Sequence, residues 1–295
     1  MRKRRGSLST IGLIAFVAMG ALAAQEPEVM SAELKPATSE AFERYARATE
    51  ARIDREISQQ GAFLYTAGLP GPRRDAVRAM LQRGEVYMER LQSRDGAGKE
   101  MKAPDALIHH WIGAAFIPCV TLQQTLELVQ DYNRHQDIYK PEVLRSKLVS
   151  RNGDDFKIYY RLRKKKVITV TLNTDHDVHY LLLGSQRATS RSYTTRIQEV
   201  AEADTPQERE KPVGNDGGFL WRLYSYWRFE ERDGGVFIEC ESISLTRDIP
   251  FVVSWIVKPF VTDIPKESLQ MTMSSTRRAL LANVSENCKQ QSSAQ

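Results

Sequence analysis

The sequence predicts an α+β fold: a curved antiparallel β-sheet wrapped around a long C-terminal helix, with a helical extension on its N-terminal side. Short runs of alternating apolar and polar residues, typical of strands with one buried face, follow one another from residue 106. The last long segment, residues 264–284, instead carries apolar residues at helical spacing. An antiparallel sheet of about six or seven strands needs a cover for its apolar face, and this helix is the only long element left to supply one.

The first 24 residues predict a cleaved secretory signal peptide. A basic start, Arg2-Lys3-Arg4-Arg5, is followed by an apolar run of 14 residues that ends in small side chains. That run is short for a membrane span, so we expect cleavage near Ala23 to Gln25 rather than retention as an anchor. The mature protein is then expected to be periplasmic or extracellular, without a stable transmembrane segment.

Removal of residues 1–24 changes the charge balance. The chain has 42 basic and 37 acidic residues, and the signal segment contributes four basic and no acidic ones. The mature chain keeps 38 basic and 37 acidic residues, so a broad basic surface for nucleic acid is not expected. Three scattered cysteines, Cys119, Cys240 and Cys288, are too few for a disulfide scaffold, and whether two of them pair is left open.

Residues 25–105 are predicted to form a helical extension. Apolar residues recur at helical spacing between Ser39 and Gly61, and a second short helix is expected at residues 73–83. The polar, glycine-bearing residues 92–105 mark a boundary. The main domain is therefore expected to cover residues 106–284, and the polar residues 285–295 to form a disordered tail.

Within the main domain, residues 106–118 are predicted to form a strand, and residues 121–139 a helix with Thr121 as its N-cap. Residues 156–163 and 167–174 alternate like the two strands of a hairpin. Pairing Leu162 with Ile168 keeps their apolar side chains on one face and leaves three lysines, residues 164–166, at an exposed turn.

The stretch "GFLWRLYSYWRFEERDGGVFIECESISL", residues 218–245, predicts a second hairpin. A turn at Asp233-Gly234 places aromatic and small polar residues on one inward face. The opposite face is expected to be solvated and charge-paired. The expected inward pairs are Phe229 with Ile238, Trp227 with Cys240, Ser225 with Ser242 and Leu223 with Ser244, and the outward pairs are Arg228 with Glu239 and Tyr226 with Glu241.

This order of elements resembles the START-related, polyketide-cyclase and lipid-transfer (SRPBCC) superfamily, which has the helix-grip fold. The resemblance covers about residues 106–284 and is carried by "IHHWIGAAFIP" leading into "TLQQTLELVQDYNRHQDIYKPEV", by "DGGVFIECESISL" and by "IPKESLQMTMSSTRRAL". It implies a cavity that binds lipids, quinones, sterols or aromatic small molecules, or that catalyses cyclisation or hydrolysis. The superfamily shares no catalytic signature, so the resemblance implies no residue roles.

Few residues point to catalysis. His109 and His110 are neighbours on one strand and must face opposite sides, so one of them is expected to face the cavity. Asp175, Asp177 and His179 could share a face, but no further ligand with obvious spacing accompanies them, and neither a metal site nor a cofactor is predicted. The sequence also has no nucleophile-elbow and no phosphate-loop motif.

We therefore predict an exported protein that binds or carries an apolar or aromatic small molecule or a lipid. Aromatic side chains would supply apolar contact, and the serines would orient the ligand. Two alternatives are a cyclase- or hydrolase-type enzyme with a cavity histidine or tyrosine as acid–base, and a packed envelope protein that acts through its surface. The residues expected to line the cavity are Trp221, Leu223, Ser225, Trp227, Ser242, Ser244, His109 and His110.

Overall fold

The computed structural model describes residues 31–58, 62–166, 168–248, 254–282 and 284, with the side chains of the last helix described from residue 263 on. The expected signal segment (1–24) and tail (285–295) lie outside these residues. The helical elements are α1 (Pro36–Ser58), η2 (Thr66–Gly68), α2 (Gly71–Gln82), α3 (Leu122–Gln130), η3 (Tyr132–Arg134), α4 (His135–Ile138) and α5 (Ser254–Ala282). The strands are β1 (Ala32–Glu33), β2 (Tyr87–Arg90), β3 (Ala106–Pro118), β4 (Val143–Asn152), β5 (Asp155–Lys165), β6 (Thr169–Leu182), β7 (Arg187–Ala201), β8 (Arg209–Glu210), β9 (Asn215–Asp216), β10 (Arg222–Arg232) and β11 (Gly235–Arg247).

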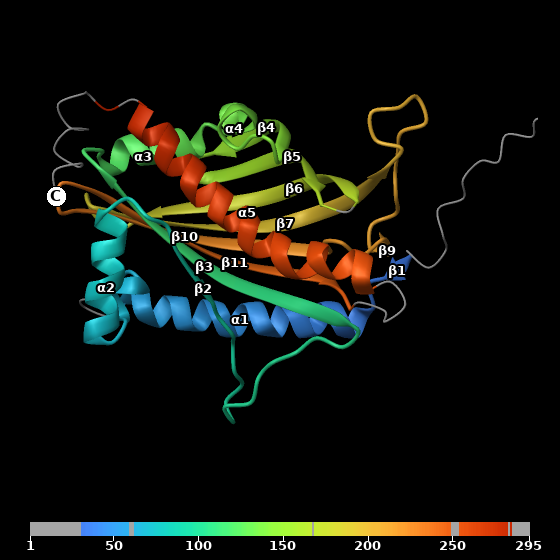
Figure 1. The fold of residues 1–295 in the computed structure, drawn as a ribbon, viewed down its shortest axis with the longest axis horizontal. Coiled ribbons are helices and arrows are strands. Elements are labelled where there is room, and N and C mark those ends of the chain that lie inside the picture. Colours follow the sequence, from blue (N-terminus) through green and yellow to red (C-terminus); the bar gives the residue numbers. More distant parts are fainter. Residues whose placement is uncertain (1–30, 59–61, 167, 249–253, 283, 285–295) are drawn as a thin grey trace, which may run out of the picture. The chain divides into compact units, whose positions relative to one another are not determined.

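One large antiparallel sheet organises the described chain. Its nine strands follow the order β2-β3-β11-β10-β7-β6-β5-β4, with the short β8 paired to β7. The sheet is open, with β2 and β4 at its two edges (Figure 1). The expected α+β architecture, a large antiparallel sheet with a long C-terminal helix packed against it, is confirmed.

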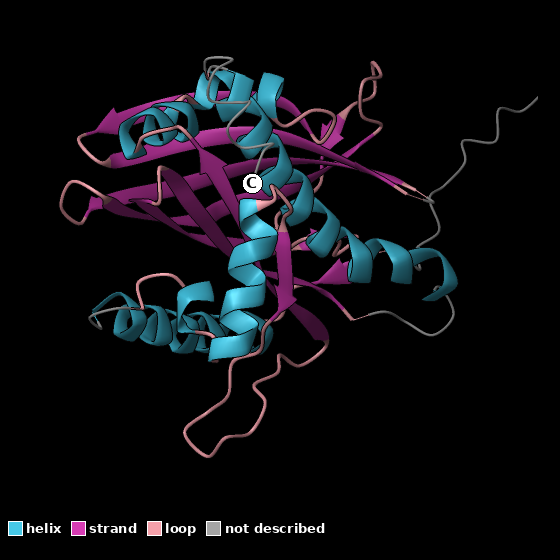
Figure 2. Cartoon of the chain, turned by 60° about the vertical axis from the view of Figure 1, so that its left-hand side comes forward, coloured by secondary structure: helices cyan, strands magenta, loops and turns pink. Residues whose placement is uncertain are grey.

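Helices cover both faces of this sheet, as Figures 1 and 2 show. On one face, Leu269 and Met273 of α5 pack in a core cluster with Phe229, Ile238 and Cys240 of the central strands. The opposite face is covered by α1, which forms a second buried cluster, while α2 contributes to a third. None of the helices in the described residues is long and apolar enough to cross a membrane.

The predicted register of the β10–β11 hairpin is confirmed. The structure pairs Phe229 with Ile238 and Ser225 with Ser242, and the intervening pairs follow. The turn residues Asp233 and Gly234 both have positive φ angles, of 56° and 75°. A two-residue turn of this kind matches the right-handed twist of the strands, which is why this dipeptide fixed the register.

The predicted register of the β5–β6 hairpin is wrong. Leu162 pairs with Leu172 rather than with Ile168, because β5 continues to Lys165 and the chain turns after it. Lys164 therefore lies inside a strand, on the same face as Leu162. Three consecutive lysines favoured an exposed turn, but Lys165 is exposed while Lys164 is largely buried in the strand.

The predicted helix at residues 121–139 is divided into three parts, α3, η3 and α4. Thr121 caps α3 as expected, and its hydroxyl accepts from the backbone of Gln124 in a capping box. The interruption falls at Asp131, whose ψ of 66° is not helical. The break lets Tyr132 pack into the core under the sheet while α4 continues beside β4.

The face expected to be solvated is instead buried, so this prediction is wrong. Arg228, Glu239 and Glu241 are each about 1% exposed. The guanidinium of Arg228 donates to Glu56 of α1 at 2.7 Å. Glu239 accepts hydrogen bonds from the backbone amides of Tyr65 and Thr66. These charged groups find their partners within the protein rather than in solvent. The partners offset the free-energy cost of removing the charges from water.

Candidate functional site

A cavity of about 270 Å³ lies between α5 and the inner face of the sheet. The strands β5, β6, β7, β10 and β11 form its floor, α5 crosses above it, and the region from α3 to the start of β4 closes one side. Most of the lining is apolar or aromatic, as ligand cavities require. Among the lining side chains are Val129, Ile158, Leu162, Leu172, Val178, Phe219, Leu223, Trp227, Phe229, Ile264 and Leu269.

A row of three serines crosses the floor of the cavity. The β-register places Ser225 of β10 beside Ser242 of β11 on one side and beside Ser192 of β7 on the other. All three line the cavity and are only half-buried. Serine fills little of the space above the sheet, so this row leaves volume where larger residues would pack against α5.

Five of the predicted lining residues lie around the cavity: Leu223, Ser225, Trp227, Ser242 and Ser244. Trp221 does not. It precedes the first residue of β10, so the alternation of the strand does not set its direction. Its ring packs in the cluster beneath α1, and its indole N–H donates to Asp216 at 3.1 Å.

His109 and His110 face opposite sides of the sheet, as neighbours on a strand must. His109 is buried behind the cavity wall and hydrogen-bonds the hydroxyl of Thr246, which is itself a lining residue. His110 lies on the α1 face, where it contacts Tyr45 at 2.8 Å and Glu241 at 2.6 Å. Of these two histidines, only His110 contacts a carboxylate, and it lies outside the cavity, so the geometry gives no support to His109 or His110 as a cavity acid–base.

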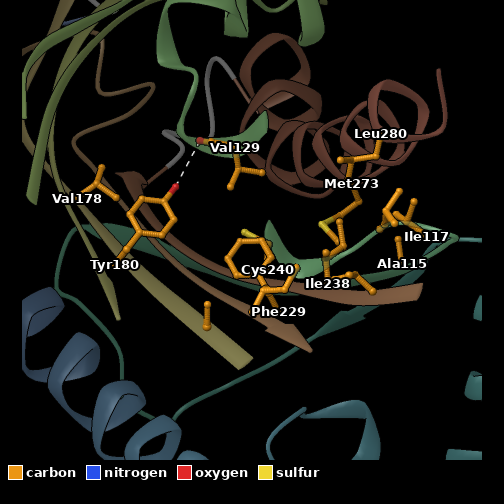
Figure 3. Packing of buried hydrophobic residues seen from close by; sticks show 14 of the residues in the cluster. Ala115, Ile117, Val129, Val178, Tyr180, Phe229, Ile238, Cys240, Met273 and Leu280 are labelled. Atoms are coloured by element: carbon orange, nitrogen blue, oxygen red, sulfur yellow. Dashed lines mark hydrogen bonds between the residues drawn. The ribbon is translucent and has the colours of Figure 1, made fainter. Parts of the chain in front are cut away.

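The histidines that do line the cavity are His135 and His176, which the sequence did not single out. His135 lies against Tyr160, with its Nδ1 at 2.6 Å from the phenol oxygen. Nearby, the hydroxyls of Tyr132 and Tyr180 meet at 2.9 Å. Figure 3 shows the Tyr180 hydroxyl pointing to the carbonyl of Val129, to which it donates. Only the tertiary arrangement brings these rings together, because they come from three separate segments.

Burial keeps this aromatic cluster uncharged. It lowers the pKa of His135 and that of His176 to about 4. It also raises the pKa of Tyr139, which lines the same cavity, to about 12. At neutral pH these groups can donate and accept hydrogen bonds, but a histidine with so low a pKa is a weak general base. The cluster is thus suited to hold a polar group rather than to move a proton.

The cavity has one charged corner, formed by Lys164 and Glu142. The ammonium of Lys164 makes an ion pair with the Glu142 carboxylate and donates to the hydroxyl of Ser268 on α5 at 2.5 Å. All three residues line the cavity. Burial lowers the pKa of Lys164 to about 7, against the opposing effect of Glu267. Because the β5–β6 register was predicted wrongly, Lys164 was not placed in the cavity from the sequence. The alternation of Tyr160, Leu162 and Lys164 along the strand could have indicated that all three side chains share one face.

Asp175, Asp177 and His179 do not come together as a metal site. Asp175 pairs with Arg196 and Asp177 with Lys157, whereas His179 is hydrogen-bonded to Asp155. In the part of the chain that the structure describes, no group of three or more potential metal-ligating side chains is present.

Two carboxylates, Asp216 and Glu199, lie close to Phe219, a residue of the cavity lining whose backbone amide donates to Glu199. Asp216 and Glu199 are 2% and 3% exposed. The backbone amide of Gly217 donates to Glu199, and that of Gly218 donates to Asp216. Burial, together with the charge of Glu199, raises the pKa of Asp216 to about 7.

This shift predicts a pH-dependent effect of the Asp216→Asn substitution. An acid whose folded pKa is raised binds its proton more tightly in the folded state, so its ionisation weakens the fold as pH rises from about 4 to 7. The asparagine cannot ionise, so between about pH 4.5 and 8 the variant should gain roughly 2–4 kcal/mol of unfolding free energy relative to the wild type. Urea unfolding at the two pH values measures this gain.

Asp75→Asn is the control, because Asp75 is exposed and pairs with the adjacent Arg74. Its effect should be the same at both pH values. If Asp216→Asn changed the free energy of unfolding equally at the two pH values, ionisation of Asp216 would not be the cause of the pH dependence.

Comparisons with known proteins find likeness at the level of structure. No protein-family model matches the sequence, and no curated protein matches it. Human STARD10 is similar with a TM-score of 0.43 and 13% identity over 76% of this chain and 84% of that one. A STAR-related lipid transfer protein from Xanthomonas axonopodis gives 0.42 and 14%, over 65% and 98% of the two chains. The Zhui aromatase/cyclase from Streptomyces sp. R1128 gives 0.38 and 9%, over 61% and 98%.

The chain has the arrangement expected of a helix-grip fold. Its long C-terminal helix crosses an antiparallel sheet, and the lined cavity lies between them. Similarities of this size do not identify a ligand, so the ligand has to be argued from the chemistry of the cavity itself.

Proposed function

We propose that this protein binds or carries an apolar or aromatic small molecule, or a lipid chain, in the cavity between α5 and the sheet. The observation that carries the proposal is the serine row under a mostly apolar lining, which leaves about 270 Å³ unfilled in the middle of the fold. A cavity of this character stabilises an apolar molecule by removing it from water, and the serines offer hydrogen bonds that orient it.

Export is part of the same proposal. The basic start and short apolar run of residues 1–24 support it. Cys119 is disulfide-bonded, which fits an oxidising compartment, whereas Cys240 is a free, buried thiol. Fractionation of cells that produce the full chain, with N-terminal sequencing of the mature protein, tests this part separately.

Apolar ligands should stabilise the purified protein against heat. A ligand that binds only the folded state at about 100 times its dissociation constant adds about 2.7 kcal/mol to the free energy of unfolding. A panel of uncharged apolar and aromatic compounds, followed by thermal unfolding, should therefore contain members that raise the melting temperature by several degrees. If no compound and no lipid extract shifted it, the carrier proposal would fail and a surface-acting protein would be the better account.

A further inference from the structure

We propose that the ligand of this cavity is an uncharged amphiphile whose terminal hydroxyl group is held between Lys164 and Glu142. This inference rests on the proposed ligand-binding function and specifies its ligand. It follows from three features: the position of the ion pair, the number of hydrogen-bonding sites that the pair leaves open, and the charge of the lining.

The ion pair occupies one end of the cavity. Lys164 is the penultimate residue of β5 and pairs with Val170 at the start of β6, whereas Tyr180 lies near the other end of β6. Glu142 comes directly before β4, and Ser268 lies on α5, so three separate elements meet here. The side chains of Lys164 and Glu142 are 14% and 21% exposed, so the pair is largely withdrawn from solvent yet borders the cavity.

The pair leaves both a donor and an acceptor open. A lysine ammonium has three N–H donors, and Lys164 uses one on Glu142 and one on Ser268. A carboxylate accepts at both of its oxygens, and only one oxygen of Glu142 is engaged by Lys164. A hydroxyl group can accept from the remaining lysine N–H and donate to the free carboxylate oxygen at the same time. A hydrocarbon end can do neither.

The charge of the lining selects against ionic head groups. Among the described lining residues, Lys164 and Glu142 are the only ones that are charged at about pH 6, since the low pKa values of His135 and His176 keep both imidazoles neutral. The two charges cancel. A carboxylate or ammonium head would therefore bring an uncompensated charge into a site of low dielectric constant.

The rest of the lining fits the other end of such a molecule. From the ion pair toward Tyr180, the cavity passes Leu162, Leu172 and Val178, which offer only apolar contact. The hydrophobic chain of the ligand would run along this path over the serine row, with its polar end at α5.

The test compares four twelve-carbon probes that differ only in the head group: dodecane, dodecanol, dodecanoate and dodecylammonium. Each competes with the uncharged fluorophore N-phenyl-1-naphthylamine, measured at about pH 6, where Lys164 is protonated because its pKa is about 7 and where Glu142 and Glu267 face it. We expect dodecanol to bind about tenfold more tightly than the other three, which corresponds to one well-made hydrogen-bonded contact.

Two variants connect this preference to the pair. Lys164→Met should reduce the affinity for dodecanol to that for dodecane, whereas Lys165→Met, on the exposed face of the same strand, should leave all four affinities unchanged. Glu142→Gln leaves the lysine charge without its counterion, so it should reverse the preference, and dodecanoate should bind about tenfold more tightly than dodecanol.

Equal affinities for dodecanol and dodecane in the wild type would show that the pair only stabilises the fold. Tightest binding of dodecanoate would show an anion site instead. Either result overturns this inference and leaves the proposed function standing, because the fluorophore and the apolar chains still bind. Failure of the fluorophore and of every probe to bind would overturn the proposed function as well.

Discussion

Replacing Ser225 by phenylalanine is expected to weaken the binding of an apolar ligand by about tenfold or more, while the free energy of unfolding changes by less than about 1 kcal/mol. Ser225 lies in the middle of the floor, flanked by Ser192 and Ser242 on the neighbouring strands. A phenyl ring at this position points into the space that the ligand would occupy and needs no movement of the sheet. Displacement of an uncharged fluorophore measures the affinity, and urea unfolding measures the stability.

The same substitution separates a cavity from a packed core. If α5 filled the space above Ser225, the added ring would be overpacked and would cost about 1–3 kcal/mol or more. Ser150→Phe, at an exposed position on β4, is the matched control and should alter neither binding nor stability appreciably. A strongly destabilised Ser225→Phe protein would contradict the account of an open cavity.

Arg228→Met is expected to lower the free energy of unfolding by about 3–5 kcal/mol. The guanidinium is fully buried between the sheet and α1, where it donates to Glu56 and to the backbone carbonyl of Phe63. It also lies 3.7 Å from Glu241. Removing the cation leaves Glu56 and Glu241 to share the charge of Arg52 alone and takes the nearby positive charge away from the buried Glu239. The methionine side chain restores only the packing. Urea unfolding, with hydrogen exchange of α1, measures the effect.

Arg78→Met is the control for this substitution. Arg78 makes an ion pair of similar length with Asp233, but its side chain is 51% exposed. Exposed pairs contribute about 0–1 kcal/mol, so the control should stay close to the wild type. Similar losses for both variants would mean that the buried network beneath α1 does not hold the helix to the sheet.

The sequence predicted the architecture well where a local pattern determines the outcome. The turn at Asp233-Gly234 determines the register of its hairpin, and the alternation along β10 and β11 therefore places Ser225 and Ser242 on the cavity side. The apolar stripe of the last helix likewise predicts that it covers a sheet. Each of these inferences needs only neighbouring residues.

Predictions failed where a distant segment decides the environment. Arg228 and Glu241 look like residues of a solvated face, because charged side chains are rarely buried. Their burial follows from α1, whose own apolar stripe required a partner, and Ile243 and Leu245 on the same side were the visible sign of it. The composition of a strand alone does not say which helix will cover it.

The charged corner of the cavity was missed for a different reason. Lys164 and Glu142 belong to different elements and meet only through the tertiary fold. In addition, the predicted β5–β6 register was wrong and placed Lys164 in a turn, whereas the structure has it in strand β5. His135, Tyr160 and Tyr180 were missed in the same way, because nothing in their separate sequence contexts indicates that their side chains converge.

The central claim is that the space above the serine row holds an apolar molecule. Mass spectrometry of the full chain, purified from its native source under non-denaturing conditions, tests it directly. We expect the wild type to retain a small molecule with an apolar chain and an uncharged polar end, and the Ser225→Phe variant, prepared in parallel, to lose it. A wild-type protein without any bound molecule, or one whose bound molecule is retained equally by the variant, would contradict the account.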